Sequence, residues 1–388
     1  MTDLDRFLEL YERTFDPVDR PPSRSARARK VASHLKQTLQ ATRRYGGTVR
    51  DVAGVPVPKQ LAGQLAMRAR YGLGPDSFYR YRLYEARHRR DAKGYLRGVV
   101  DARMRDLVLA QLGADTSALD DKAKFFHVCR ESGVPTIEVL ASFAGGRVTW
   151  HSADGRLPAR DLFTKPAQAD GGEGVQLWTC ESGTYATEGD GPLTADALVG
   201  RLAEWSRSSD WLVQPRLRDH PDLARLSSGG LCTVRVVTAM EGPESGPDVL
   251  VTVLRMAASS TTVDNFGEGG LAAPVDPATG VLGPAVRKDI AEAAVDVSVH
   301  PATGHRIEGA RVPHWDEVLA LARRAHRAFP GLLVIGWDIA VTTEGVVVVE
   351  GNAKPGSNLS QQPGSRPLGL TALPGIYLRA LQSRAGPT

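Results

Sequence analysis

Two apolar runs near the carboxyl end constrain the fold of this chain most strongly, because each carries a carboxylate within a predicted buried strand. The first, residues 336–340 (GWDIA), contains Asp338, and the second, residues 346–352 (VVVVEGN), starts with four valines and ends with Glu350 and Asn352. Side chains two residues apart in a strand point to the same face, so Glu350 and Asn352 project together. If the two strands pair across the short turn between them, Asp338 lies beside Glu350.

Oxygen atoms gathered in this way suit a hard cation. Mg²⁺ prefers carboxylates together with phosphate oxygens, and we therefore predict that Asp338, Glu350 and Asn352 bind magnesium. The alternative is that the two carboxylates are strand-end residues that face water. A carboxylate between apolar neighbours in a buried strand is costly without a partner, which favours the metal site.

A second feature, residues 163–174 (FTKPAQADGGEG), places Lys165 at the end of a predicted strand and follows it with Gly171, Gly172 and Gly174. Glycines let backbone N–H groups close on phosphate oxygens, and a lysine adds positive charge. The segment is neither a Walker A loop nor a dinucleotide fingerprint, because no helix is expected to open after the glycines. Since a simple hairpin also needs glycines, the loop indicates a phosphate site only together with the carboxylates.

Two lysines and two arginines lie at positions that are unfavourable for a positive charge without a partner. Lys122 and Lys124 follow a predicted helix start at residues 120–121, where the helix dipole disfavours positive charge. Either an anionic ligand or plain solvent exposure accounts for them. Arg235 and Arg255 lie inside apolar strands, where a guanidinium needs either a phosphate or an internal salt bridge.

The amino-terminal part has a helical pattern and is strongly basic. Residues 1–106 contain 23 Lys and Arg against 12 Asp and Glu, whereas the rest of the chain is net acidic by 7. We predict a helix over residues 25–44 that ends at Gly46-Gly47. The charge is typical either of a solvated helical surface, which we favour, or of a site for nucleic acid or another polyanion.

From about residue 112 onward, short β-rich runs alternate with helical ones, which predicts an α+β fold with antiparallel sheets. The expected strands cover residues 136–140, 161–165, 175–178, 211–214, 233–240, 249–256, 332–340 and 345–350, and the expected helices cover 122–132, 194–207 and 315–328. The three cysteines form neither a CxxC pair nor an even-numbered framework, so neither zinc nor disulfides are expected. No apolar run approaches the ~18 residues of a membrane span and no secretory signal is recognisable, so we expect a cytoplasmic location without membrane contact.

The order of the motifs resembles one known family. Asp121-Lys122 is followed by Lys165 with its glycine loop, then by VQPR (213–216), TVRVVT (233–238), VDNFGEGG (263–270), IGWDIA (335–340) and VEGN (349–352). This order resembles the ATP-grasp superfamily in its sugar-transfer-associated branch, which is related to glutamate-ligase-like proteins. The resemblance covers residues 71–370 and rests on several separate motifs.

The resemblance implies a role for each motif. The nucleotide phosphates would be contacted by Lys122 and Lys165 and covered by the loop of Asp170, Gly171, Gly172 and Gly174. The hinge that reads adenine would be formed by Gln214, Pro215, Arg216 and Leu217. One or two Mg²⁺ ions would be held by Asp338, Glu350 and Asn352. The γ-phosphate and an acyl phosphate would be faced by Arg235, Arg255 and Asn265, and the substrate pocket by Ser357, Asn358 and Gln361.

The fold implied is α+β: an ATP-grasp fold, with two α+β subdomains that clasp ATP, preceded by an Arg-rich helical segment. Its domains would be residues 1–112 (helical), 113–216 (the lid subdomain with the glycine loop) and 217–388 (the large subdomain with the metal site). Two features depart from the family pattern. Gln214 stands where many members have a hinge glutamate, and the basic helices replace the usual Rossmann-like domain that helps to bind substrate.

The activity implied is that of an ATP-dependent carboxylate–amine ligase, which forms an acyl phosphate with release of ADP and uses ATP and Mg²⁺. Its substrates would be a small-molecule carboxylate and an amine, with the acceptor free or linked to a carrier, a peptide or a sugar. The absence of a GxSxG elbow agrees with a mechanism that needs no covalent nucleophile. Two alternatives stay open: a small-molecule kinase on the same fold, and a non-catalytic protein that binds a polyanion or carrier.

Overall fold

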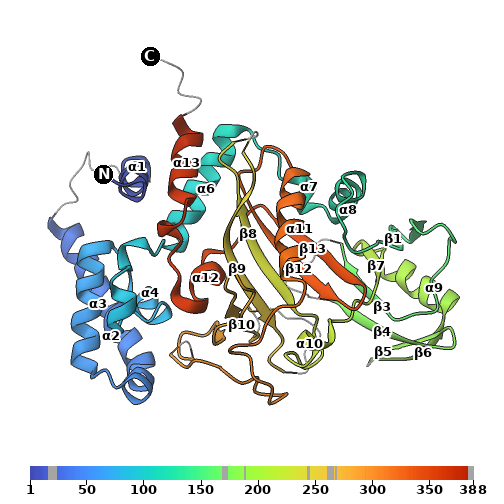
Figure 1. Ribbon diagram of the computed structural model, residues 1–388, viewed down its shortest axis with the longest axis horizontal. Coiled ribbons are helices and arrows are strands. Elements are labelled where there is room, and N and C mark those ends of the chain that lie inside the picture. Colours follow the sequence, from blue (N-terminus) through green and yellow to red (C-terminus); the bar gives the residue numbers. More distant parts are fainter. Residues whose placement is uncertain are drawn as a thin grey trace.

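The computed structural model of the protein describes residues 1–15, 24–167, 174–187, 189–242, 245–259, 266, 269–292 and 294–382. It contains a seven-stranded and a six-stranded β-sheet, and the amino-terminal helices stand at the opposite end of the molecule from β4, β5 and β6 (Figure 1). All described pairings between the named strands are antiparallel. The predicted α+β class with a helical segment in front is therefore confirmed.

The amino-terminal part is helical, as predicted. Its helices are α1 (Asp3–Phe15), α2 (Arg24–Ala53), α3 (Val57–Tyr71), α4 (Pro75–Arg80), α5 (Ala86–Arg89), η1 (Ala92–Gly94) and α6 (Gly98–Leu112). The predicted helix end at Gly46-Gly47 is wrong, because α2 continues to Ala53. Gly46 instead lets α3 approach closely: an added Cβ would lie 3.2 Å from Oε1 of Gln60, whose Nε2 donates to the Gly46 carbonyl oxygen at 3.0 Å.

The seven-stranded sheet has the strand order β2-β1-β7-β3-β4-β5-β6. Its strands are β1 (Ala141–Ala144), β2 (Arg147–Trp150), β3 (Leu162–Pro166), β4 (Gln176–Glu181), β5 (Thr184–Thr187), β6 (Asp190–Thr194) and β7 (Trp211–Pro215). Helix α9 (Ala195–Trp205) packs on it through the fully buried Leu198 and Leu202. The first strand starts at Ala141 and not at the predicted residue 136, because Thr136 forms a single bridge to Val348 of the other sheet.

The six-stranded sheet has the order β11-β10-β9-β8-β12-β13. Its strands are β8 (Thr233–Ala239), β9 (Asp248–Met256), β10 (Leu271–Pro274), β11 (Val286–Arg287), β12 (Val334–Thr342) and β13 (Gly345–Asn352), and the remaining helices are α7 (Ser117–Asp120), α8 (Lys122–Glu131), α10 (Pro221–Ala224), α11 (Trp315–Arg327), α12 (Ser357–Gln361), η3 (Pro363–Ser365), η4 (Leu368–Leu370) and α13 (Leu373–Gln382). One face packs against α8 and α11, where Phe125, Leu321 and Trp337 are buried together. No helix in the described part of the chain is both long and apolar enough to cross a bilayer.

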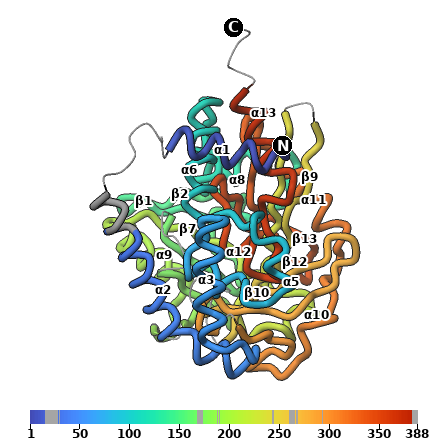
Figure 2. The backbone as a smooth tube through the Cα atoms, turned by 90° about the vertical axis from the view of Figure 1, so that its left-hand side faces the viewer, coloured from blue at the N-terminus to red at the C-terminus, as the bar shows by residue number. Residues whose placement is uncertain are grey.

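The opposite face of the six-stranded sheet is covered by helices from both ends of the chain. Phe7 of α1, Met104 of α6 and Tyr377 of α13 share one buried cluster with Val237 of β8 (Figures 1 and 2). The chain is tightly packed there, because an added Cβ at Gly369 would lie 2.6 Å from the carbonyl oxygen of Gly94. The amino-terminal helices α1 and α6 therefore share a core with this sheet.

Gln361 joins α12 to the amino-terminal segment. Its Nε2 donates to the Tyr81 hydroxyl (3.1 Å) and to the Leu96 carbonyl oxygen (2.9 Å), while its Oε1 accepts from the backbone N–H groups of Leu96 (2.9 Å) and Leu368 (3.1 Å). All donors and acceptors of this fully buried amide are thus used. The prediction that Gln361 faces a substrate pocket is wrong, because the side chain is committed to packing.

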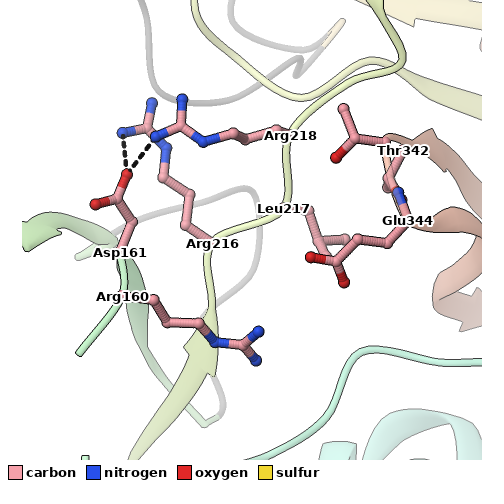
Figure 3. A pocket seen from close by; sticks show the side chains of 8 residues that line it. Arg160, Asp161, Arg216, Leu217, Arg218, Thr342 and Glu344 are labelled. Carbon is pink, nitrogen blue, oxygen red and sulfur yellow. Dashed lines mark hydrogen bonds and ion pairs between the residues drawn. The ribbon is translucent and has the colours of Figure 1, made fainter. Parts of the chain in front are cut away.

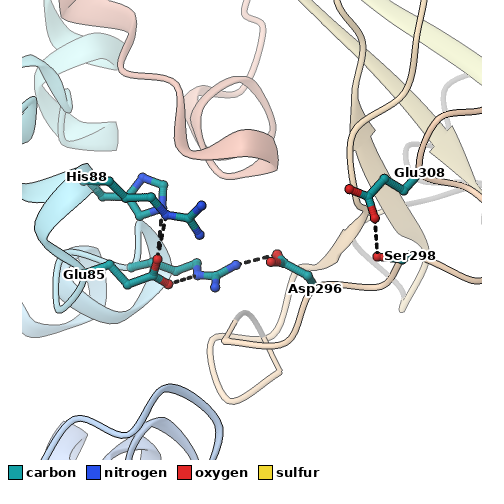
Figure 4. Close-up of polar contacts among 7 residues, drawn as sticks. Glu85, His88, Asp296, Ser298 and Glu308 are labelled. Carbon is teal, nitrogen blue, oxygen red and sulfur yellow. Dashed lines mark hydrogen bonds and ion pairs between the residues drawn. The ribbon is translucent and has the colours of Figure 1, made fainter.

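A polar contact also links α5 to the long irregular segment before α11. The Arg82 guanidinium forms ion pairs with Glu85 (2.6 Å) and with Asp296. Figure 4 shows Glu85 and His88 facing Asp296 across the gap between the two segments. The side chains of Arg82 and Glu85 are only 14% and 18% exposed, whereas that of Asp296 is 40% exposed, so water reaches the Asp296 end of this contact.

His326 fixes the position of Trp337, the neighbour of Asp338. Its Nε2 donates to the Leu332 carbonyl oxygen (2.8 Å), and its Nδ1 lies 2.6 Å from the Thr238 hydroxyl, which also accepts a hydrogen bond from Trp337 Nε1 (2.8 Å). The Leu332 carbonyl oxygen places a proton on Nε2, and a neutral imidazole can then accept at Nδ1 from the Thr238 hydroxyl. Burial lowers the pKa of His326 from 6.5 to about 4.

We expect the free energy of unfolding to decrease in mild acid because of His326. A group whose pKa is lower in the folded state contributes stability that is present above the unfolded value and is lost as the pH falls through the folded value. Between pH 6.5 and about 4, the loss should amount to on the order of 3 kcal/mol. Denaturant unfolding across this range should show the slope in the wild type and a smaller slope in His326→Gln. Equal slopes would contradict the assignment.

Candidate functional site

A cavity of about 370 Å³ lies between the two sheets, under α7 and α8. Its polar lining consists of Asp120, Lys122, Thr136, Lys165, Gln214, Glu350 and Asn352, and its apolar lining includes Phe125, Phe126, Ile137 and Val139. The seven-stranded sheet contributes Lys165 and Gln214, whereas the six-stranded sheet contributes Glu350 and Asn352. The cavity thus brings together residues that are far apart in the sequence and that were predicted to bind nucleotide or metal.

The carboxylates come from two neighbouring strands. β12 and β13 pair antiparallel, with Asp338 opposite Glu350 and Gly336 opposite Asn352, and the register shifts at a bulge directly after Asp338. The Asn352 amide nitrogen donates to Glu350 Oε1 at 3.2 Å. Burial of the Glu350 carboxylate, together with the negative charge of Asp338, raises the pKa of Glu350. These oxygens therefore lie on one face of the sheet.

Asp338 is the buried centre of an ion-pair network. Its carboxylate accepts Arg235 Nε at 2.6 Å and Arg235 Nη2 at 2.9 Å, and it also accepts Arg255 Nη1 at 2.8 Å. The side chain of Asp338 is only 3% exposed. Burial opposes ionisation, but the two guanidinium groups outweigh it and hold the pKa of Asp338 below its usual range. Of the two partners expected for these arginines, a phosphate or an internal salt bridge, the structure shows the salt bridge.

Two lysines reach the cavity from different elements. In β3, Leu162 and Thr164 point into the core, so Phe163 and Lys165 face the cavity side. Lys122 is the first residue of α8, and Asp121 caps this helix by accepting hydrogen bonds from the N–H groups of residues 123 and 124. The Nζ of Lys122 donates to the Ala167 carbonyl oxygen at 2.9 Å. Removal from water, together with the charge of Lys122, lowers the pKa of Lys165 to about 8.

The segment after β7 connects the two sheets and is bonded to both. On one side, the Arg216 N–H donates to the Asp161 carbonyl oxygen (3.0 Å), and the Arg218 guanidinium pairs with the Asp161 carboxylate (2.6 Å). On the other side, the Thr343 N–H donates to the Arg218 carbonyl oxygen (3.2 Å). A second cavity of about 290 Å³ opens here, lined by Arg160, Asp161, Arg216, Leu217, Arg218, Thr342, Thr343 and Glu344 (Figure 3).

Gln214, at the end of β7, lines the main cavity and is 6% exposed. Within the described part of the chain, its buried Oε1 accepts no hydrogen bond. A buried acceptor without a donor favours a ligand that carries an N–H or O–H group. Adenine and ribose both carry such groups, so the residue fits a nucleotide.

The remaining predicted residues are placed as follows. Pro215, Arg216 and Leu217 follow Gln214 on the connecting segment, and Arg235 and Arg255 lie beneath the cavity wall around Asp338. Asp170, Gly171, Gly172 and Asn265 lie outside the described residues. Gly174 has a φ of +72° that favours glycine.

Sequence reasoning missed the residues that shape the cavity without carrying charge. Phe125 and Phe126 were read only as part of a helical pattern, and residues 136–140 only as a strand. Asp161 was also missed, although a lone aspartate just before a strand and near several arginines is a usable signal. Lys124, which shared the interpretation given to Lys122, is exposed and is not part of the cavity lining.

The donor set fits magnesium. Of the predicted donors, Glu350 and Asn352 offer a carboxylate and an amide oxygen to the cavity, whereas both oxygens of Asp338 behind them accept from Arg235 and Arg255. Mg²⁺ commonly takes one or two carboxylates and completes its shell with phosphate oxygens and water. The raised pKa of Glu350 has burial as its main cause and the charge of Asp338 as its second. Among the described residues, no group of three His, Cys, Asp or Glu side chains forms an all-protein metal site.

Comparison with known proteins gives one strong match. The family model described as sugar-transfer associated ATP-grasp matches residues 112–371, which is more than half of the 388 residues. No curated protein matches the chain.

Several solved structures resemble the chain distantly. D-alanyl-alanine synthetase A from Vibrio cholerae O1 biovar eltor str. N16961 is 11% identical, with 69% of this chain and 65% of that chain covered and a TM-score of 0.39. D-alanine–D-alanine ligase from Bacillus anthracis is 14% identical (74% and 76% covered, TM-score 0.37), and L-amino acid ligase from Bacillus licheniformis is 12% identical (67% and 48% covered, TM-score 0.37). The chain spans about half the length of the first two solved chains it matches, at 51% and 48%.

We expect the affinity for ADP to decrease above about pH 8. Without ligand, the Lys165 ammonium loses its proton as the pH rises through that value, whereas a bound polyphosphate favours the charged form. Binding then requires uptake of a proton, so the Kd should rise by up to about tenfold per pH unit. Calorimetric titration should show this rise in the wild type and a flatter profile in Lys165→Arg, whose guanidinium stays charged. A wild-type Kd that is constant across this range would contradict the prediction.

Proposed function

The chain belongs to the sugar-transfer associated ATP-grasp family, and we propose that it is an ATP-dependent carboxylate–amine ligase that works through an acyl phosphate and releases ADP. The observation that carries this proposal is the convergence of Lys122, Lys165, Glu350 and Asn352 on one cavity between two sheets. Two cations opposite two oxygen donors form a site for a polyphosphate with its metal ion.

In this proposal the nucleotide lies across the cavity. Its phosphates contact Lys122 and Lys165, and the loop at residues 170–174 covers them. Its base lies at the connecting segment 214–217, where the unpaired Oε1 of Gln214 accepts a hydrogen bond from the nucleotide. The pairing of β12 with β13 supports this placement, because it puts the oxygen atoms of Glu350 and Asn352 in the same cavity as the two lysines.

Asp338, Glu350 and Asn352 are the proposed holders of Mg²⁺, which when bound would neutralise charge on the phosphates. The protein's own contribution is to fix these donors in place. The bidentate pair between Arg235 and Asp338 orients the carboxylate, and Arg255 holds it from the next strand but one. The arrangement therefore depends on side chains from four strands, β8, β9, β12 and β13.

The proposed chemistry has two steps. An oxygen of the substrate carboxylate attacks the γ-phosphorus of ATP and the bond to ADP breaks, which yields an acyl phosphate. An amine then attacks the acyl carbon, inorganic phosphate leaves, and the amine loses a proton as the amide forms. Asn265 is proposed to face the transferred phosphoryl group, whereas Arg235 and Arg255 act from behind the site through their ion pairs with Asp338. Positioning with charge neutralisation is proposed to supply most of the rate.

The proposed substrates are a small-molecule carboxylate and an amine, with the acceptor free or linked to a carrier, a peptide or a sugar. The test is mass spectrometry of a reaction that contains the protein, ATP, Mg²⁺ and a pool of amino acids, amines and polyamines. Formation of ADP together with a condensed product supports the proposal. ADP with a phosphorylated small molecule and no amine requirement would indicate a kinase instead, and no nucleotide turnover with any pool would contradict both.

Glu350→Gln and Lys165→Ala should each lower ADP release by at least about 100-fold, because the first removes an anionic ligand of the proposed metal ion and the second removes a cation that faces the phosphates. The protein should stay folded, since both side chains line the cavity and lie outside the main cores. The measurements are coupled detection of ADP and circular dichroism. Lys124→Ala is the matched control, because that exposed lysine lies two residues after Lys122 on α8 and outside the cavity lining. Retained turnover in both site variants would remove the basis of the proposal.

A further inference from the structure

The helix pair α2–α3 forms the end of the molecule opposite β4–β6 and has no part in the cavity (Figure 1). Within the pair, Thr38, Thr42, Tyr45 and Val49 of α2 are buried. Gln64 of α3 donates a hydrogen bond to the Thr42 hydroxyl at 2.8 Å. One face of α2 is therefore covered by its neighbours over this stretch.

Towards its amino-terminal end, α2 leaves a line of aliphatic side chains in water. Val31, Leu35 and Leu39 are 57%, 46% and 51% exposed. They recur every four residues, so they lie along one side of the helix over about 12 Å, or two turns. Val31 and Leu35 continue the face that Thr38 and Thr42 bury further along. We call these three residues the aliphatic line.

Positive charge runs beside the aliphatic line. Arg29, Lys36 and Arg43 recur every seven residues and are exposed, which places them on the adjoining side of the helix. Within the described part of the chain, none of the three forms an ion pair. The sequences of α2 and α3 together hold 11 Lys and Arg, and their one acidic residue, Asp51, pairs with Arg50 at 2.8 Å.

We propose that this face of α2 binds an acidic amphipathic helix of a partner protein. Such a helix can pack aliphatic side chains along the aliphatic line and place carboxylates beside the basic row, so that two helices recognise each other face to face. Charge complementarity selects the acidic partner, since a second copy of this basic face would be repelled. The proposal does not depend on the ligase activity.

Nucleic acid and membrane fit the same face less well. A phosphate backbone would leave the aliphatic line in water, and single-stranded RNA is usually held by stacking on aromatic rings. Among the described side chains of α2 and α3, Tyr71 at 37% is the one exposed aromatic residue. An anionic membrane would take up the charge, but three aliphatic side chains without an aromatic anchor give weak insertion.

The test uses the full-length protein and a labelled synthetic peptide with leucine at the a and d positions of each heptad and glutamate at the others. We expect this peptide to bind, and a second peptide with serine in place of each leucine to bind at least about tenfold more weakly. Leu35→Ser with Leu39→Ser in the protein should produce a similar loss. Lys36→Glu with Arg43→Glu should weaken binding most at low salt.

Two matched controls separate this face from general surface effects. Val299→Ser removes an aliphatic side chain that is 51% exposed elsewhere, and Arg156→Glu reverses an exposed charge outside α2 and α3. Neither should change peptide binding by more than about twofold. If the double leucine variant does not fold, the comparison of the two peptides on the wild type decides.

Three outcomes would overturn the proposal. Equal affinity for the leucine and serine peptides would reduce the face to a nonspecific cationic surface. Tighter binding of oligouridylate would assign it to nucleic acid, and tighter binding of phosphatidylcholine–phosphatidylglycerol vesicles would assign it to a membrane.

Discussion

The six-stranded sheet and its candidate site both depend on the ion pairs that the Asp338 carboxylate forms with Arg235 and Arg255. A buried carboxylate is costly unless it is paired and hydrogen-bonded. Because the partners come from β8 and β9, the ion pair fixes the register of β12 against both. A slip of one residue would turn Asp338 to the apolar face that packs on α11. The register that satisfies this charge is also the one that sets Glu350 opposite Asp338.

The face of the six-stranded sheet that carries Asp338 also packs against the amino-terminal helices, so these helices are part of the same folded unit. Beyond the ion pairs, the sheet is apolar, and α1, α6 and α13 bury it. Arg105 of α6 pairs with the buried Asp101 (3.1 Å) and donates to the carbonyl oxygen of Pro355 (3.4 Å). Pro355 follows closely after Asn352, so α6, a helix of the amino-terminal part, supports the segment that leaves the candidate metal site.

The parts of the structure that the sequence predicted well are those governed by local periodicity. The two apolar runs of β12 and β13 and the short turn between them were enough to place Asp338 beside Glu350, and the position of Lys165 at a strand end placed it towards a loop. The failures needed tertiary information. Gly46 is a helix breaker by local rules, but it serves the close approach of α3. The pocket-facing position expected of Gln361 gives way to four hydrogen bonds, three with backbone groups and one with the Tyr81 hydroxyl. Whether Arg235 and Arg255 faced a phosphate or a salt bridge stayed open because their partner lies far along the chain.

Positive charge acts differently inside the cavity and on α2. In the cavity, β3 holds Lys165 partly out of water and near Lys122 of α8, so desolvation and repulsion by Lys122 already disfavour the charged, ligand-free state of Lys165 and lower its pKa. An anion that enters relieves this cost, which makes the site selective for negative charge. On α2, water solvates each cation and screens it, so charge alone attracts many anions weakly. Selectivity there has to come from the aliphatic line, whose burial rewards only a partner with apolar side chains at a helical repeat.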